Sequence, residues 1–271
     1  MRPDNSIVIR IEGVTLRYGC VEALRDVTID IKRGEFLGII GPNGSGKTSL
    51  LKCINGILKP LAGTIYLDGR LIENLNPKEI ARICASVPAE IPEHLNITVS
   101  DFVFLGRYPY IRGIWWEDKQ DEEFVKRVLA YLQLCHLKRR KLSEISSGEL
   151  QRVLLARAMA QNPKVLLVDE PCAHLDLKYK LEVMELLKAL SKNGITIIAS
   201  SHDVNLLSRY CDRIILLNRG KIAAVGKPED VITERTIKEV YGIEVLIITD
   251  KDGIFVIPRR PLPSFSGNGS D

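Results

Sequence analysis

The sequence predicts an α/β fold built around a mostly parallel sheet, and three observations lead to that prediction. An uninterrupted apolar run at residues 36–40 is typical of a strand buried on both faces, and a glycine-rich loop and a helical pattern follow it directly. From residue 165 onward, apolar runs alternate with helical patterns, as expected when helices cover a parallel sheet. Before residue 36, apolar and polar residues alternate instead, which indicates an antiparallel β lobe at the start of the chain.

The elements of the first half follow from local periodicity and turn residues. The Asp68-Gly69 pair is a typical hairpin turn between two short strands. The expected elements are strands at 6–17, 27–31 and 36–40, a helix containing Leu50, Leu51 and Ile54, a hairpin at 63–71, a short helix at 77–83 and a strand ending at Val87-Pro88.

Residues from about 97 to 160 have a mostly helical pattern with a Trp115-Trp116 loop inside it, which predicts an inserted helical lobe. The expected elements beyond it are strands at 165–168 and 195–199, helices at 175–192 and from Asp203, a hairpin at 214–217 and 221–225, and a last strand pair at 245–248 and 254–257. From Pro258 the chain is rich in Pro, Ser and Gly. We therefore divide it into one domain at 1–258 and a loose tail at 259–271.

Composition excludes several classes of protein. The 38 basic and 34 acidic residues give a net charge of +4, which does not by itself argue for nucleic-acid binding. The six cysteines are scattered, and no two have the spacing of a zinc site or a redox motif. Residues 1–5 do not resemble a secretory signal. No apolar stretch is long enough to span a bilayer, so at a membrane another chain would have to supply the spans.

The segment Gly41-Pro42-Asn43-Gly44-Ser45-Gly46-Lys47-Thr48 has the spacing of a phosphate-binding loop, in the required strand–loop–helix setting. Glycines allow successive backbone N–H groups to turn toward phosphate oxygens, and the following helix adds its positive N-terminal end. Lys47 would contact the β- and γ-phosphates, and the Thr48 hydroxyl would bind Mg²⁺. We expect residues 41 to 48, with Ser49, to bind nucleotide; the alternative is a glycine-rich turn without a ligand.

Two acids, Asp169 and Glu170, follow the buried strand at 165–168. Ligands of open α/β sheets bind at the carboxyl ends of the strands, where these side chains would lie. Asp169 is suited to hold Mg²⁺, and Glu170 is suited to accept a proton from an attacking water. Taken alone, the pair could also be solvated acids at the end of a strand. The phosphate-binding loop favours the catalytic interpretation.

A serine–glycine turn, Ser146-Ser147-Gly148-Glu149, opens a long helical run that reaches Ala160. Such a turn is suited to bind an anion at the helix N-terminus, although it is equally suited to cap the helix without a ligand.

With its flanks, the turn resembles the LSGGQ motif of the ABC ATPase family, with Ile145 for Leu, Ser147 for the first Gly and Glu149 for Gln. The resemblance extends from about residue 7 to 245. It implies that Ser146, Gly148 and Glu149 contact the nucleotide held by a second copy of the chain.

Three more positions resemble the family. Tyr18 lies upstream of the loop, where the family has an aromatic residue that stacks on adenine, although a purely structural tyrosine is the alternative. Leu175-Asp176 resembles the end of the D-loop. His202 follows the strand at 195–199, as the family's switch histidine does, and this resemblance implies that it stabilises charge on the γ-phosphate.

Two segments resemble the iron–siderophore, haem and vitamin B12 uptake branch of the family. They are Asn96–Tyr110, with its Gly106-Arg107-Tyr108-Pro109 motif, and residues 202–206 together with residues 210–213. The branch implies an ATP- and Mg²⁺-dependent importer subunit that works as a homodimer with membrane permease subunits, and indirectly with a substrate-binding protein. It also implies a peripheral position at the cytoplasmic face of the cell membrane.

The sequence departs from the family at two positions. Ala89 follows Val87-Pro88, where the family's Q-loop has a glutamine, and Glu90 is the nearest side chain able to replace it. Ala173 occupies the serine position of the D-loop. Two alternatives stay open: an ATP-binding regulatory subunit with weak turnover, which these changes favour slightly, and a non-transport ABC ATPase. The second lacks support because no heptad coiled coil lies between the loop and the LSGGQ-like turn.

Overall fold

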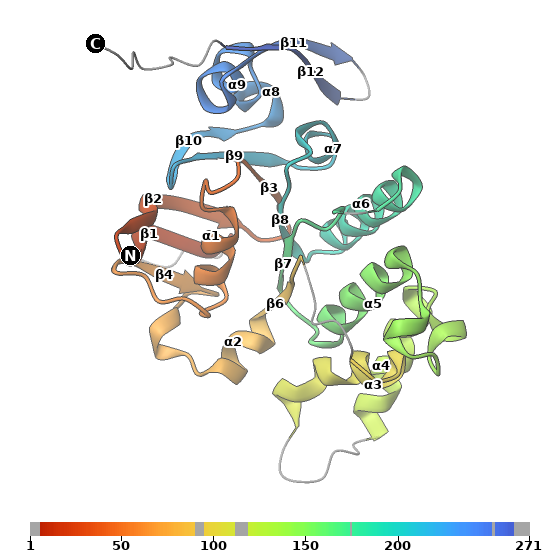
Figure 1. Ribbon diagram of the computed structural model, residues 1–271. Coiled ribbons are helices and arrows are strands. Elements are labelled where there is room, and N and C mark those ends of the chain that lie inside the picture. Colours follow the sequence, from red (N-terminus) through yellow and green to blue (C-terminus); the bar gives the residue numbers. More distant parts are fainter. Residues whose placement is uncertain (1–5, 90–94, 112–118, 174, 251–252, 263–271) are drawn as a thin grey trace.

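The computed structural model describes residues 6–89, 95–111, 119–173, 175–250 and 253–262, and Figure 1 shows how their helices and strands are arranged. A β lobe and a central sheet form the body of the molecule, with helices beside the sheet. A helical lobe lies to one side, and a two-stranded hairpin lies at the C-terminal end. The α/β prediction with a β lobe and an inserted helical lobe is confirmed.

The β lobe is a four-stranded antiparallel sheet in the order β2-β1-β4-β5. Its strands are β1 Ile7–Tyr18, β2 Val21–Lys32, β4 Ala62–Leu67 and β5 Arg70–Leu71. The second strand begins six residues earlier than expected, because Tyr18 pairs with Val21 in a tight turn. Asp68-Gly69 forms the predicted hairpin turn.

The central sheet has the order β10-β9-β3-β8-β7-β6 and is parallel except for its β9–β10 edge. Its strands are β3 Phe36–Ile40, β6 Cys84–Val87, β7 Val165–Asp169, β8 Thr196–Ser200, β9 Arg213–Asn218 and β10 Lys221–Gly226. Successive residues of a strand face opposite sides, so Phe36 and Leu37 belong to two different apolar clusters. Burial on both faces explains why β3 is uninterruptedly apolar.

The helices of the body begin near the carboxyl ends of the strands or connect the strands. They are α1 Lys47–Ile54, α2 Pro77–Ile83, α6 Leu177–Lys192 and α7 Val204–Ser208. The helix expected from residue 175 begins at Leu177, because Asp176 has extended backbone angles and takes the N-cap position. The helix expected from Asp203 begins one residue later, because the Asp203 side chain caps it through the N–H of Leu206 at 2.9 Å.

The helical lobe consists of α3 Val99–Phe104, α4 Lys119–Tyr131 and α5 Ser147–Ala160, with 3₁₀ turns η2 Leu105–Tyr110, η3 Cys135–Leu137 and η4 Leu142–Glu144. The buried side chain of Arg107 connects segments of the helical lobe. Its guanidinium donates to Asp121 and to the carbonyl of Ala160, each at 2.7 Å. A Cβ on Gly106 would lie 2.2 Å from the Arg157 carbonyl oxygen, so only glycine fits there. The Trp115-Trp116 loop lies outside the described residues.

The C-terminal segment comprises α8 Pro228–Val231, α9 Glu234–Tyr241, β11 Ile243–Asp250 and β12 Gly253–Pro261. The two strands pair antiparallel and are longer than expected. The irregular structure expected from Pro258 is therefore wrong for 258–261, where β12 continues because its residues pair with β11. Among the described residues, no helix has both the length and the apolar composition needed to cross a membrane.

Candidate active site

The predicted phosphate-binding loop connects β3 to α1 at the carboxyl end of the sheet. Gly41 and Gly46 both have positive φ. A Cβ on Gly41 would lie 2.3 Å from the Leu217 carbonyl oxygen, and one on Gly46 would lie 2.5 Å from that of Ala23. Glycine is therefore required at both positions, because of the backbone angle and because of the limited space. Among the remaining expected nucleotide contacts, Ser45 and Lys47 are buried, Pro42 and Ser49 are half-buried, and Asn43, Gly44 and Thr48 are exposed.

The Lys47 ammonium lies over this loop. Its Nζ donates to the carbonyl oxygens of Gly41 at 2.9 Å and Pro42 at 3.2 Å. Burial lowers the pKa of Lys47, while the charges of Glu170 and Asp169 act in the opposite direction. The loop carbonyls and the two carboxylates thus hold a partly desolvated cation where phosphates would bind.

The two predicted acids lie at the end of β7, beside β8. The hydroxyl of Ser200 donates to Asp169 Oδ1 and also accepts from the backbone N–H of Glu170 at 3.1 Å. Glu170 has a φ of 49°, in the left-handed region. One serine therefore fixes both acids across neighbouring strands. Ser200 was not predicted from the sequence, where its only signal was its place two residues before His202.

His202 joins Glu170 to Lys47. Its Nε2 lies 3.0 Å from Glu170 Oε1, and its backbone N–H donates to Oε2 at 3.2 Å. Its Nδ1 lies 3.5 Å from the Lys47 ammonium. The structure therefore brings together the three residues that the sequence analysis assigned to catalysis, although they come from three separate segments.

Asp169 and Thr48, the two expected Mg²⁺ ligands, offer a carboxylate and a hydroxyl. These are oxygen donors of the kind that Mg²⁺ prefers, and in nucleotide sites phosphates and waters supply the remaining ligands. The Asp169 carboxylate is oriented by Ser200, and Thr48 lies exposed in the first turn of α1. The side chains present fit the ion, and its binding stays a prediction.

The LSGGQ-like turn lies in the helical lobe, and Figure 1 shows its helix, α5, apart from α1. Ser146 and Glu149 form a capping box: the backbone N–H and the hydroxyl of Ser146 donate to the Glu149 carboxylate at 2.8 and 2.9 Å, and the N–H of Glu149 donates to Ser146 Oγ at 3.3 Å. The bond from the Ser146 backbone lowers the pKa of Glu149. Both side chains that were expected to contact nucleotide are thus engaged with each other.

Packing against a neighbouring helix requires glycine at position 148, which the sequence did not reveal. A Cβ there would lie 2.6 Å from the ring of Tyr179 on α6. The turn therefore packs closely against the helix that follows the D-loop.

The remaining predicted positions lie at the surface. Tyr18 ends β1 with 47% of its surface exposed, so its ring is accessible to a base. Ala89 is exposed beyond the end of β6, and Glu90, its possible substitute, lies outside the described residues. Ala173 is also exposed, and Asp176 takes the N-cap position of α6 without a capping hydrogen bond from its side chain.

With Lys47 above the loop and Glu170 held against His202, the fold and site define a P-loop ATPase. Residues 24–173 match the family model of the ABC transporter, and the chain belongs to that family. It is 37% identical to an uncharacterized ABC transporter ATP-binding protein of Bacillus subtilis, of which it spans 54%.

Two relatives are matched over most of both chains. A petrobactin import ATP-binding protein of Bacillus anthracis is 38% identical over 88% of each chain. A ferric enterobactin transport ATP-binding protein of Escherichia coli is 35% identical over 89% of this chain and 90% of its own length.

Solved structures agree with the fold. One is an inward-facing metal-chelate type ABC transporter, with a TM-score of 0.82 and 24% identity over 94% of this chain and 98% of that chain. Another is a dimeric bacterial ABC transporter cassette, with a TM-score of 0.71 and 32% identity over 81% of this chain and 98% of the other.

Proposed function

We propose that this chain is the ATP-hydrolysing subunit of an ABC importer for an iron–siderophore, haem or cobalamin-type substrate. The observation that carries the proposal is the contact of Lys47, His202 and Glu170 at the phosphate-binding loop. The relatives named for petrobactin and ferric enterobactin import support the substrate class.

The site's own groups define the chemistry. The loop amides and Lys47 bind the triphosphate, and Glu170 accepts the proton of the attacking water. His202 and Lys47 stabilise the charge that develops on the γ-phosphate. Mg²⁺, which would be held by Thr48 and Asp169, neutralises phosphate charge when bound. Tyr18 stacks on the adenine.

The complete site needs two copies of the chain. Ser146 and Gly148 lie in the helical lobe, away from the loop of the same chain (Figure 1). In a homodimer they bind the nucleotide on the second copy, through the N-terminal end of α5. The ionised Glu149 would repel the γ-phosphate, so it acts through its contact with Ser146 rather than by binding phosphate directly. The dimeric relative supports this assembly.

Permease subunits complete the assembly, with a substrate-binding protein acting through them at the other side of the membrane. Leu105 and Tyr108 are exposed by 47% and 56%. They lie three residues apart in η2 and therefore share one face of that 3₁₀ turn. This apolar face suits docking to a membrane partner, which would hold the chain peripherally at the cytoplasmic face.

A regulatory ATP-binding subunit with weak turnover is the second candidate. It is favoured by Ala89, because an exposed methyl group offers no oxygen to Mg²⁺ or to the attacking water. The Glu170–His202 contact favours hydrolysis.

The decisive experiment compares Mg-ATP hydrolysis by the wild type and by Lys47→Ala, measured as steady-state phosphate release. We expect activity in the wild type and none in the variant, with the same circular dichroism spectrum for both. Equal turnover in the two proteins would refute the ATPase assignment. Co-reconstitution with a candidate permease, with and without ferric siderophore, haem and cobalamin, then tests the transport assignment.

A further inference from the structure

The position of His202 depends on the backbone on either side of it. Half of its side chain is exposed, so packing around the imidazole does little to hold it. On the N-terminal side, Ser201 is buried and its N–H donates to the carbonyl of Ile39 on β3 at 3.1 Å. On the C-terminal side, the helix α7 begins at Val204. How firmly α7 is held therefore decides how firmly the histidine is held.

The helix α7 has only five residues. Helices this short are unstable unless tertiary contacts stabilise them. The Asp203 side chain caps the N-terminus of α7 through the N–H of Leu206 at 2.9 Å. Leu206 and Leu207 are buried in the larger apolar cluster. Further contacts come from the C-terminal hairpin, which is formed by β11 and β12.

Asn205 joins the first turn of α7 to this hairpin. Its Nδ2 donates to the carbonyl of Val256 at 3.2 Å, and its Oδ1 accepts from the N–H of Val256 at 2.7 Å. A carboxamide carries both a donor and an acceptor, so one side chain satisfies both backbone groups. The strand β12 pairs with β11 along its other edge, and an open strand edge leaves such groups unpaired. The Asn205 amide therefore pairs with β12 as a further strand would.

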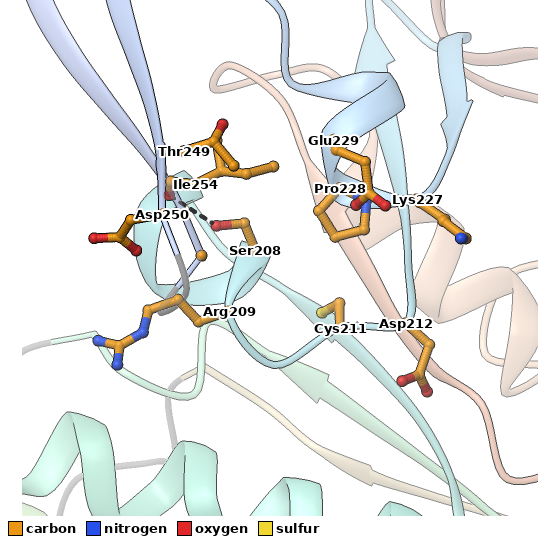
Figure 2. Close-up of a pocket in the computed structure, with 11 residues that line it drawn as sticks. Ser208, Arg209, Cys211, Asp212, Lys227, Pro228, Glu229, Thr249, Asp250 and Ile254 are labelled. Carbon is orange, nitrogen blue, oxygen red and sulfur yellow. Dashed lines mark hydrogen bonds between the residues drawn. The ribbon is translucent and has the colours of Figure 1, made fainter.

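A second contact with the hairpin lies at the other end of α7. The Ser208 hydroxyl donates to the carbonyl of Ile254 on β12 at 3.3 Å, and Figure 2 shows this contact. Ser208 is the last residue of α7, whereas Asn205 lies in its first turn. The hairpin thus holds both ends of the helix, and Asn205 provides the contact nearer to His202.

We propose that Asn205 is a positioning residue for ATP hydrolysis, which fixes His202 against Glu170 by binding the first turn of α7 to the C-terminal hairpin. His202 contacts Glu170 through its imidazole at 3.0 Å and through its backbone N–H at 3.2 Å. Both contacts depend on the same stretch of backbone, so a shift at the start of α7 disturbs both. The inference rests on the proposed ATPase function and extends it to the C-terminal segment.

The test is Asn205→Ala, which removes both hydrogen bonds to Val256. We expect kcat to fall about tenfold, because small displacements of catalytic groups have large effects on rate. The KM for ATP should change less than twofold, because Lys47 is held by loop carbonyls rather than by the hairpin. Asn205→Asp keeps the acceptor for the Val256 N–H but loses the donor, and its kcat should lie between those of Asn205→Ala and the wild type.

Two controls separate positioning from a general loss of stability. In the background of His202→Ala, which lacks the imidazole, Asn205→Ala should lower the residual turnover less than twofold, because its effect acts through that group. Ser208→Ala removes the contact with the same hairpin at the far end of α7. It should lower the midpoint of thermal unfolding, as Asn205→Ala does, but keep kcat within twofold of the wild type.

Three outcomes would overturn the proposal. Asn205→Ala keeps kcat within twofold of the wild type, Ser208→Ala lowers kcat as much as Asn205→Ala does, or Asn205→Ala has the same effect with and without the imidazole. If Asn205→Ala does not fold, the same criteria apply to Asn205→Asp. An inactive wild type would instead refute the ATPase assignment itself, so the two failures are distinguishable.

Discussion

His202 contacts both oxygens of the Glu170 carboxylate, with its Nε2 3.0 Å from Oε1 and its backbone N–H donating to Oε2 at 3.2 Å. Residues that orient a general base limit the directions from which it can accept a proton. The contact therefore fixes Glu170 while the imidazole remains beside the Lys47 ammonium.

Replacing Glu170 with Gln removes the proton acceptor but keeps the shape of the side chain. We expect ATP to remain bound without being hydrolysed and the protein to shift from monomer to dimer on adding Mg-ATP, because hydrolysis normally releases the two copies. Light scattering with and without ATP measures the shift. The Lys47→Ala, Glu170→Gln double variant is the control and should stay monomeric. A monomeric Glu170→Gln protein with normal turnover would remove Glu170 from the role of base.

Ser146 caps α5, and we propose that it also binds phosphate on the second copy. Ser146→Ala should lose about 1 kcal/mol in the free energy of unfolding, because the cap to Glu149 is lost, and should also lose ATPase activity. Ser146→Asp should keep the stability, since aspartate is a good N-cap, but lose the activity because its charge repels phosphate. Urea unfolding and phosphate release measure the two effects. Normal hydrolysis by Ser146→Asp would contradict a phosphate-binding role.

Ala89, which is exposed beyond the end of β6, has no side-chain oxygen. We expect Ala89→Gln to raise ATPase turnover or to tighten its coupling to the permease, because a glutamine can orient the attacking water. The affinity for ATP should change little, since water can fill a Mg²⁺ position. Turnover is compared with that of Glu90→Ala, with and without the permease. If Glu90→Ala is nearly inactive and Ala89→Gln gains nothing, Glu90 is the functional substitute.

Asp68 ties three segments together through ion pairs with Arg33 and Lys164. Burial raises the pKa of Asp68, but the hydrogen bonds and charges of Lys164 and Arg33 outweigh it and hold the pKa below its usual value. A carboxyl group whose pKa is lower in the folded protein stabilises the fold at pH values above its unfolded-state pKa. This stabilisation is lost as the pH falls through the folded-state pKa.

Asp68→Asn should therefore lower the free energy of unfolding by about 1 kcal/mol at pH 7, and the difference should shrink below pH 3.8. Asparagine tolerates the positive φ of 53° at this position. Urea titrations at pH 7 and pH 3 provide the measurement. Asp26→Asn is the control, because Asp26 also has positive φ but takes part in none of the ion pairs found among the described residues. A difference independent of pH would show that charge is not the cause.

The sequence by itself determined the features that depend on neighbouring residues. The phosphate-binding loop follows from glycines at Gly41 and Gly46, because backbone angles are a local property. The strand before Asp169 and Glu170 follows from an apolar run, since burial on both faces requires it. The predicted ends of the elements were less accurate. The helix expected from residue 175 begins after Asp176, because a helix start depends on backbone angles that apolar periodicity does not encode.

Only the tertiary structure decided which distant side chains meet. Lys47, Glu170 and His202 follow β3, β7 and β8, and they come together because those strands are neighbours in the order β3-β8-β7. Local patterns do not specify strand order. The same reason applies to Gly148 against Tyr179, where the contact arises from packing between elements far apart in the chain. Local hydrogen bonding and periodicity thus set the elements, and burial of their apolar faces against one another set the site.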